Sequence, residues 1–111
     1  SLIIDRSWSF QDSTKKESYE FFAMGIAKDS IVSVYLSLLE GLSFAVCKYS
    51  LEFRDDFFEI KFKNCDPAPE CMFMYCYLQD EKLYILPSSK KLKMGRELLE
   101  EKDWAEMTEG K

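Results

Sequence analysis

Three strand patterns in close succession, between residues 51 and 93, constrain the fold of this chain more than any other feature. Phe58, Ile60 and Phe62 alternate with charged residues, as in a strand that is buried on one face. After a loop at 64–70 that holds two prolines, residues 71–78 form a nearly unbroken apolar run, typical of a strand buried on both faces. A polar turn at 79–81 leads into a third strand at 82–86. The pattern predicts a three-stranded antiparallel meander.

The first half of the chain predicts helices. Thr14-Lys15-Lys16-Glu17 fits a capping box, and apolar residues follow at helical spacing as far as Ile26. Asp29-Ser30 fits a second helix start, and helical spacing continues from Ile31 to Leu42, with Gly41 near the expected end. These signals predict a helical hairpin over 14–42, preceded by a strand within residues 2–10.

A last helix is predicted over 94–107, with Met94, Leu98, Leu99, Trp104 and Ala105 as its apolar contacts. The complete expectation is a single α+β domain over residues 1–111. It consists of an N-terminal strand, a helical hairpin, a three-stranded antiparallel meander and a C-terminal helix, with the helices packed on one face of the sheet.

The basic residues gather at the end of the predicted meander. The chain carries a net charge of −5, yet residues 82–96 hold five Lys or Arg and no acid, while six acids and two lysines follow from Glu97. A basic cluster in an acidic chain indicates contact with an anionic molecule. The alternative is an ordinary solvated turn.

The four cysteines show no metal-binding spacing, and the chain has no histidine. We therefore expect no cofactor and no metal, with buried free thiols in a reducing cytoplasm. Disulfides, or a metal site built from cysteines alone or from cysteines and carboxylates, are the alternatives. The missing histidine excludes Ser-His-Asp and Cys-His catalysis. No apolar run is long enough to span a membrane, and the N-terminus lacks the pattern of a secretory signal, so we expect a cytoplasmic protein with no membrane partner.

With its elements in this order, the chain resembles the HigB/RelE superfamily of toxins from bacterial toxin–antitoxin systems, in the phage-derived HigB-like branch. Segments 18–22 and 37–40 lie where that family has its helical hairpin, and 51–61 is similar to its "Leu-Arg-Asp-Gly-aromatic-Glu-Leu-Arg" run. Segments 74–77 and 82–86 resemble the next two strands, and Lys90-Lys91 falls near the family's Lys-Lys. The resemblance covers residues 8–107.

The resemblance implies an mRNA endoribonuclease, with or without a requirement for the ribosome, that inhibits translation by metal-independent cleavage. Lys61, Lys90 and Lys91 would be its catalytic cations. Arg54, Lys93, Tyr75 and Tyr77 would bind substrate, the tyrosines by stacking on a base or relaying a proton. The alternatives are a turn contact with Asp55 for Arg54, a solvated position for Lys61 and core packing for the two tyrosines.

The implied partners are an antitoxin protein and mRNA or the ribosome, with no direct binding to DNA. Two other functions stay open. One is an acidic immunity or inhibitor protein that binds a basic partner through Asp55-Asp56 and the 97–109 region. The other is a RelE-like domain without catalytic activity.

Overall fold

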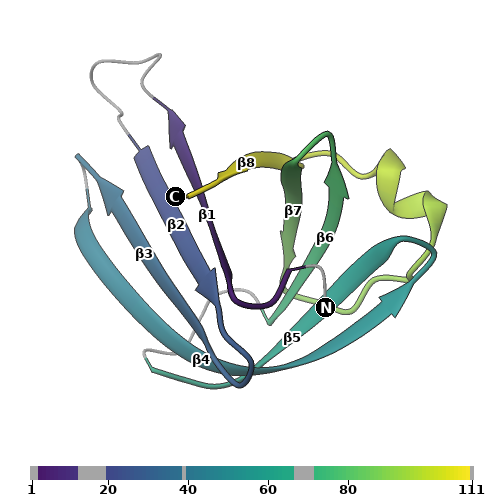
Figure 1. Ribbon diagram of the computed structural model, residues 1–111, viewed down its shortest axis with the longest axis horizontal. Coiled ribbons are helices and arrows are strands. Elements are labelled where there is room, and N and C mark those ends of the chain that lie inside the picture. The colour runs from purple at the N-terminus through teal and green to yellow at the C-terminus, as the bar shows by residue number, and fades with distance from the viewer. Residues whose placement is uncertain (1–2, 13–19, 39, 67–71, 111) are drawn as a thin grey trace.

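Eight antiparallel strands close into a barrel in which each strand pairs with the next along the chain and the last pairs with the first (Figure 1). The computed structural model describes residues 3–12, 20–38, 40–66 and 72–110. The strands are β1 (Arg6–Asp12), β2 (Glu20–Ile26), β3 (Ile31–Ser37), β4 (Gly41–Arg54), β5 (Phe57–Asp66), β6 (Phe73–Gln79), β7 (Lys82–Ser88) and β8 (Ala105–Glu109), and one short 3-10 helix, η1 (Arg96–Glu100), precedes β8.

Tight turns of acidic residues join the strands at one end of the barrel. Asp55 and Asp56 connect β4 to β5 with φ of 53° and 69°, and Asp80 and Glu81 connect β6 to β7 with φ of 53° and 66°. Two positive φ angles in a two-residue loop define the hairpin turn whose twist matches that of the strands it joins. Asp tolerates this conformation better than most residues.

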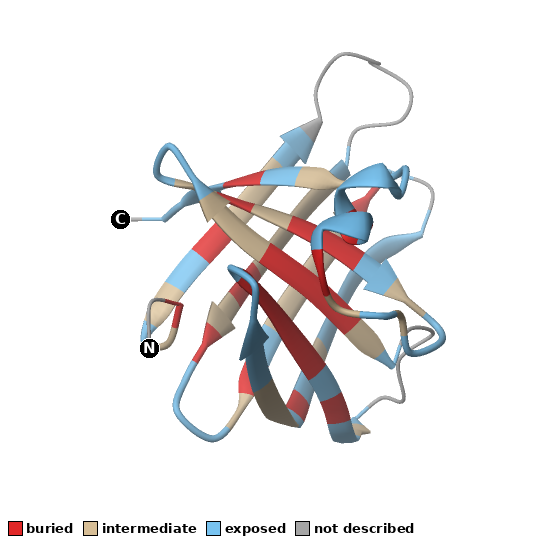
Figure 2. Ribbon diagram, turned by 90° about the vertical axis from the view of Figure 1, so that its right-hand side faces the viewer, coloured by how far each residue is buried: buried red, intermediate tan, exposed pale blue. Residues whose placement is uncertain are grey.

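All eight strands contribute side chains to a core inside the barrel. Alternate residues point inward, as expected for strands, and Figure 2 shows buried positions recurring along them. The buried members of this core are Ile3, Trp8, Met24, Ile26, Ile31, Cys47, Phe58, Ile60, Phe62, Met74, Cys76, Leu83, Ile85 and Met107.

A second apolar cluster lies outside the barrel. Residues 89–104, which connect β7 to β8 and include η1, run over the outer face of β5, β6 and β7 (right of Figure 1). Leu98 of η1 packs there against Phe57, Tyr75 and Leu86, and the Trp104 indole N–H donates to the Leu98 carbonyl at 2.9 Å. This cover explains why β6 is buried on both faces.

The expected α+β class is wrong, because the protein is an all-β barrel. The predicted helical hairpin is replaced by β2, β3 and the start of β4, while the Thr14–Glu17 capping box lies outside the described residues. In the segment Ile31–Ser37 the outward face is apolar and the inward face holds Ser33, Tyr35 and Ser37. Ile31, Val34 and Tyr35 also fit helical spacing, which is why the segment was predicted as a helix. Gly41 does occupy a left-handed turn, with φ of 79°, but the turn begins a strand.

The predicted helix over 94–107 is also wrong beyond η1. Its apolar residues face two different cores: Met94, Leu98 and Trp104 pack outside the barrel, whereas Met107 of β8 is buried inside it. The apolar face of a single helix could not pack in both the outer cluster and the barrel core. The predicted meander is confirmed as β5, β6 and β7, including its polar turn before Lys82, and Trp8–Phe10 lie in the predicted first strand.

Candidate functional site

A cavity of about 200 Å³ lies inside the barrel, between the walls formed by β2–β4 and by β5–β7. Its lining is apolar except for one hydroxyl, that of Ser33. The residues that line it are Phe22, Met24, Ile31, Ser33, Ala45, Cys47, Phe62, Met74 and Pro87.

Two small residues create this space. Ser33 of β3 and Ala45 of β4 lie directly opposite each other in the sheet, next to Met24 of β2. Phe62 and Met74 line the opposite wall. In a small eight-stranded barrel, inward side chains either fill the interior or leave room for one small ligand. Here the small side chains of Ser33 and Ala45, among larger neighbours, leave room for a small ligand.

The chemistry of the cavity is that of an apolar binding site. The cavity opens to solvent at the exposed Pro87. An apolar molecule that enters it would displace water from a surface that offers that water few polar partners. Ser33 supplies one hydroxyl that can donate or accept a single hydrogen bond. No residue of the lining carries a charge, so an ion in this space would lack a partner.

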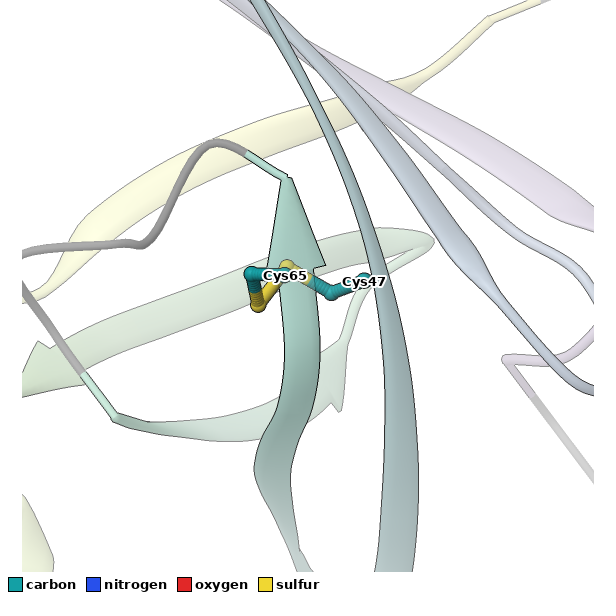
Figure 3. Close-up of a disulfide and its surroundings, with 2 residues drawn as sticks. All are labelled: Cys47 and Cys65. Carbon is teal, nitrogen blue, oxygen red and sulfur yellow. A yellow bond between two sulfur atoms is a disulfide. The ribbon is translucent and has the colours of Figure 1, made fainter.

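A disulfide forms part of the cavity wall. Cys47 of β4 is bonded to Cys65 of β5, and Figure 3 shows the bond linking the two strands. Cys47 lies where the pairing of β4 with β5 shifts, at an irregularity between Val46 and Lys48. The expectation of free thiols is therefore wrong for these two cysteines. Cys76 is a free, fully buried thiol, and Cys71 lies outside the described residues.

One end of the barrel is sealed beside Trp8. The Arg6 guanidinium lies 4.6 Å from the centre of the Trp8 ring and donates to Glu109 of β8 at 2.6 and 2.9 Å. This hydrogen bonding raises the pKa of Arg6 and lowers that of Glu109. The Trp8 indole N–H is buried without a hydrogen-bond partner, so this end of the core is closed mainly by packing.

The predicted catalytic cations lie on the outside of the barrel. Lys61 is exposed on β5, in register with Phe73 of β6 and through it with Ser88 of β7, which places it about 10 Å from the end of β7. Lys90 and Lys91 are exposed in the segment after β7. These three lysines thus lie on one side of the molecule, on its surface.

The predicted substrate-binding cations divide between two places. Lys93 is exposed on the same segment as Lys90 and Lys91. Arg54 lies at the other end of the β4–β5 hairpin, where its guanidinium is 3.5 Å from the Glu52 carboxylate. The β5 path from Phe57, the partner of Arg54, to Lys61 is about 13 Å, so Arg54 does not join the lysines.

Both predicted tyrosines are structural. The Tyr75 hydroxyl donates to the buried Glu59 carboxylate at 2.9 Å and accepts from the Leu92 amide at 2.6 Å. Burial raises the pKa of Tyr75 to about 12, so the hydroxyl keeps its proton at neutral pH. The Tyr77 ring stacks on Tyr84 at 4.8 Å and meets the edge of Trp104 at 4.9 Å. These positions agree with the core-packing alternative.

No three His, Cys, Asp or Glu side chains of residues 3–12, 20–38, 40–66 and 72–110 are placed to hold a metal ion. Over the same residues, no helix is long and apolar enough to cross a membrane.

The fold and cavity define a class of protein: an up-and-down, eight-stranded antiparallel barrel with an apolar cavity in its interior. Lipocalins and streptavidin share this general architecture. Comparison of the chain with protein-family models, with curated proteins and with solved structures finds no match.

The sequence reasoning missed the cavity because it assigned β2 and β3 to helices. One signal could have indicated strands. Three of the seven residues in Ile31–Ser37 are β-branched and aliphatic, which favours a strand. Read as a strand, that segment places Ser33 on the same face as the buried Ile31.

Proposed function

We propose that this protein binds one small, uncharged, largely apolar molecule inside its barrel. The observation that carries the proposal is the cavity of about 200 Å³, with its apolar lining and its single hydroxyl. The architecture adds support by analogy only, because barrels of this kind hold ligands of many chemistries.

The lining defines the class of ligand. Phe22, Phe62 and the two methionines offer polarisable, adaptable surfaces that suit an aromatic or branched hydrocarbon body. Ser33 can pair with one hydroxyl or carbonyl group of the ligand. A carboxylate or an amine would be disfavoured, because the lining has no charge to compensate it.

Titration with naphthalene and 2-naphthol tests this proposal, with binding followed by ligand fluorescence. We expect both to bind the wild-type protein, and 2-naphthol more tightly. Ala45→Leu fills the cavity and should abolish binding of both. Ser33→Ala should remove the preference for 2-naphthol, since one hydrogen bond contributes about 0.5–1.5 kcal/mol.

The matched control is Ala23→Leu, the same change on the outward face of β2. This variant should bind both probes as the wild type does. Absence of binding to the folded wild-type protein, or equal binding by Ala45→Leu, would reject the cavity as the ligand site.

The cellular compartment of the protein is also part of the proposal. The cytoplasmic location expected from the sequence stays a prediction. The Cys47–Cys65 bond favours an oxidising compartment instead, since structural disulfides are rare in the cytosol. Mass spectrometry of the protein from its native source, with free thiols alkylated before denaturation, would decide between the two.

The ribonuclease function, with its antitoxin, mRNA and ribosome partners, stays an untested prediction, as does membership of the HigB/RelE superfamily. Over its described residues the predicted helical hairpin is replaced by strands, and the predicted closing helix is replaced by η1, a connecting segment and the start of β8. Cleavage of mRNA on programmed ribosomes by the wild-type protein, but not by a Lys90→Ala/Lys91→Ala variant, would support the ribonuclease function instead of ligand binding.

A further inference from the structure

An uncovered apolar patch lies on the outer face of β2, β3 and β4. Strand pairing arranges its outward positions in three rows of three, and all nine residues are uncharged and apolar. The rows, taken from β2 to β4, are Phe21, Leu36 and Leu42; Ala23, Val34 and Phe44; Gly25, Val32 and Val46. We call these nine residues the outer patch.

Four of the nine residues of the outer patch are exposed, and the other five, including Val34 at its centre, are half-buried. Leu42 and Phe44 are 57% and 58% exposed, and Val32 and Val46 are 45% and 49% exposed. The inward neighbours on the same strands, such as Met24 and Ile31, are buried in the barrel core. The exposed apolar surface is therefore a second face of the same strands.

The surroundings of the outer patch are neutral on one side and charged on the other. On β1 the residues opposite its β2 row are Ser7, Ser9 and Gln11. Toward β5, Val46 pairs with Asp66, and Lys48 pairs with Lys63 beyond the irregularity. An apolar centre with a polar rim is typical of a protein–protein interface.

We propose that the outer patch is the contact between two copies of this chain, which pack face to face about a two-fold axis near Val34. The patch offers a partner no charge to pair with, so a charged partner surface would lose hydration without compensation. The outer patch itself is uncharged and apolar, and it therefore complements a second copy of itself. In a two-fold dimer each copy contributes the same surface.

The dimensions of the patch suit this arrangement. With strands about 4.8 Å apart and outward residues about 6.8 Å apart, the outer patch projects to roughly 14 by 20 Å, and to roughly 20 by 20 Å with its polar rim on β1. Its accessible area is larger than this projection because the side chains stand out from the sheet. That brings it near the roughly 600 Å² per partner at the lower end of stable interfaces. The closed barrel leaves no full strand edge for pairing, so packing of two sheet faces is the available geometry.

Sedimentation velocity over a wide range of protein concentration tests the proposal. We expect the wild type to reach the mass of a dimer as concentration rises. Val34→Glu, at the centre of the outer patch, should stay monomeric because two carboxylates would face each other. Leu99→Glu is the matched control, since Leu99 of η1 is 54% exposed but lies outside the patch, and it should dimerise as the wild type does.

A charge-reversal mixture makes the test specific. Val34→Glu mixed with Val34→Lys should regain the dimer mass, whereas each alone should not. Far-ultraviolet circular dichroism checks that each variant is folded. If Val34→Glu does not fold, Phe44→Ser, which removes apolar contact without adding charge, should weaken dimerisation by at least tenfold.

Four results would overturn the proposal. They are a wild type that is monomeric at every concentration, a dimer that persists in Val34→Glu, a dimer lost equally in Leu99→Glu, and a charge-reversal mixture that stays monomeric. Binding of a monomeric wild type to phosphatidylcholine vesicles, lost in Val34→Glu, would assign the patch to a lipid surface instead of a second copy.

Discussion

The barrel has two apolar outer faces, and among the described residues only one of them is covered by another segment of the chain. On β5–β7, residues 89–104 cross the strands, and Tyr75 is fully buried beneath them. On β2–β4, Leu42 and Phe44 are 57% and 58% exposed. The same kind of outward residue is thus core on one side of the molecule and surface on the other.

The comparison shows that burial in this protein depends on the connections as much as on the strands. Closing the barrel buries apolar side chains from the inward faces of all eight strands. An apolar outward face needs a further layer, which the long β7–β8 connection supplies once. The outer patch has no such layer, and a second copy of the chain could supply it.

The largest expected effect comes from removing the cover at its centre. Leu98→Ala should lower the free energy of unfolding by about 3–5 kcal/mol, because it leaves a cavity between η1 and the barrel. The adjacent exposed residue gives a matched control, and Leu99→Ala should change stability by less than about 0.5 kcal/mol. Urea denaturation measures both. Equal losses would mean that η1 does not act as a cover.

The disulfide connects the two regions, since it joins β4 of the uncovered face to β5 of the covered one. Its partners are 18 residues apart, and closing a loop of that length stabilises a protein by about 3 kcal/mol. Reduction of the wild type should lower the urea midpoint accordingly and weaken binding in the cavity, which Cys47 lines.

A Cys47→Ala/Cys65→Ala variant is the control for that experiment. Its urea midpoint should match that of the reduced wild type and should not respond to reductant. A wild type that is equally stable with and without reductant would show that the strand pairing, and not the disulfide, holds this junction.

The sequence predicted the covered side of the molecule better than the uncovered side. Alternation at Phe58–Phe62 and the polar pair Asp80-Glu81 identified β5 to β7, because one face of β5 carries charge and a tight turn separates β6 from β7. The strands of the outer patch were mistaken for helices for two reasons. In β2 apolar residues on both faces remove the alternation. In β3 the apolar residues do alternate, but Ile31, Val34 and Tyr35 also fit helical spacing.

The candidate site could not be predicted from the sequence. Ser33 and Ala45 form a cavity only because β3 and β4 pair in one particular register. Cys47 and Cys65 meet only because the β4–β5 pairing shifts beside Cys47. Lys90, Lys91 and Lys93 follow the last strand of the predicted meander, but local charge does not reveal whether such residues line a cleft.

Tyr75→Phe tests whether the Tyr75 hydroxyl helps to fix residues 89–104 to the outer face of β5–β7. Loss of the hydroxyl leaves the buried Glu59 carboxylate and the Leu92 amide without this partner. The free energy of unfolding should therefore fall by about 2 kcal/mol at pH 8. Tyr77→Phe is the control, because its ring contacts to Tyr84 and Trp104 remain.

The cost of Tyr75→Phe should depend on pH. The pKa of Tyr75 is about 12 in the folded protein and about 10 when unfolded, so the folded state holds the proton longer. The stabilisation from this group is complete below pH 10 and is lost as pH rises from 10 to 12. The difference in the free energy of unfolding between the wild type and Tyr75→Phe should therefore narrow by about 1 kcal/mol between pH 9 and pH 11. A gap that widens would contradict the burial of this hydroxyl.

The smallest effect is expected on the outer patch. Val46→Thr keeps the β-branched shape on an outward position that is 49% exposed, so the unfolding free energy of the isolated chain should change by less than about 0.5 kcal/mol. The measurement must be made at a concentration too low for association, because dimerisation adds stability that depends on concentration. At high concentration the same variant should lose part of that added stability, while Leu99→Ala should retain it. A large loss at low concentration would show that Val46 packs within its own chain, and the contrast between the two outer faces would then disappear.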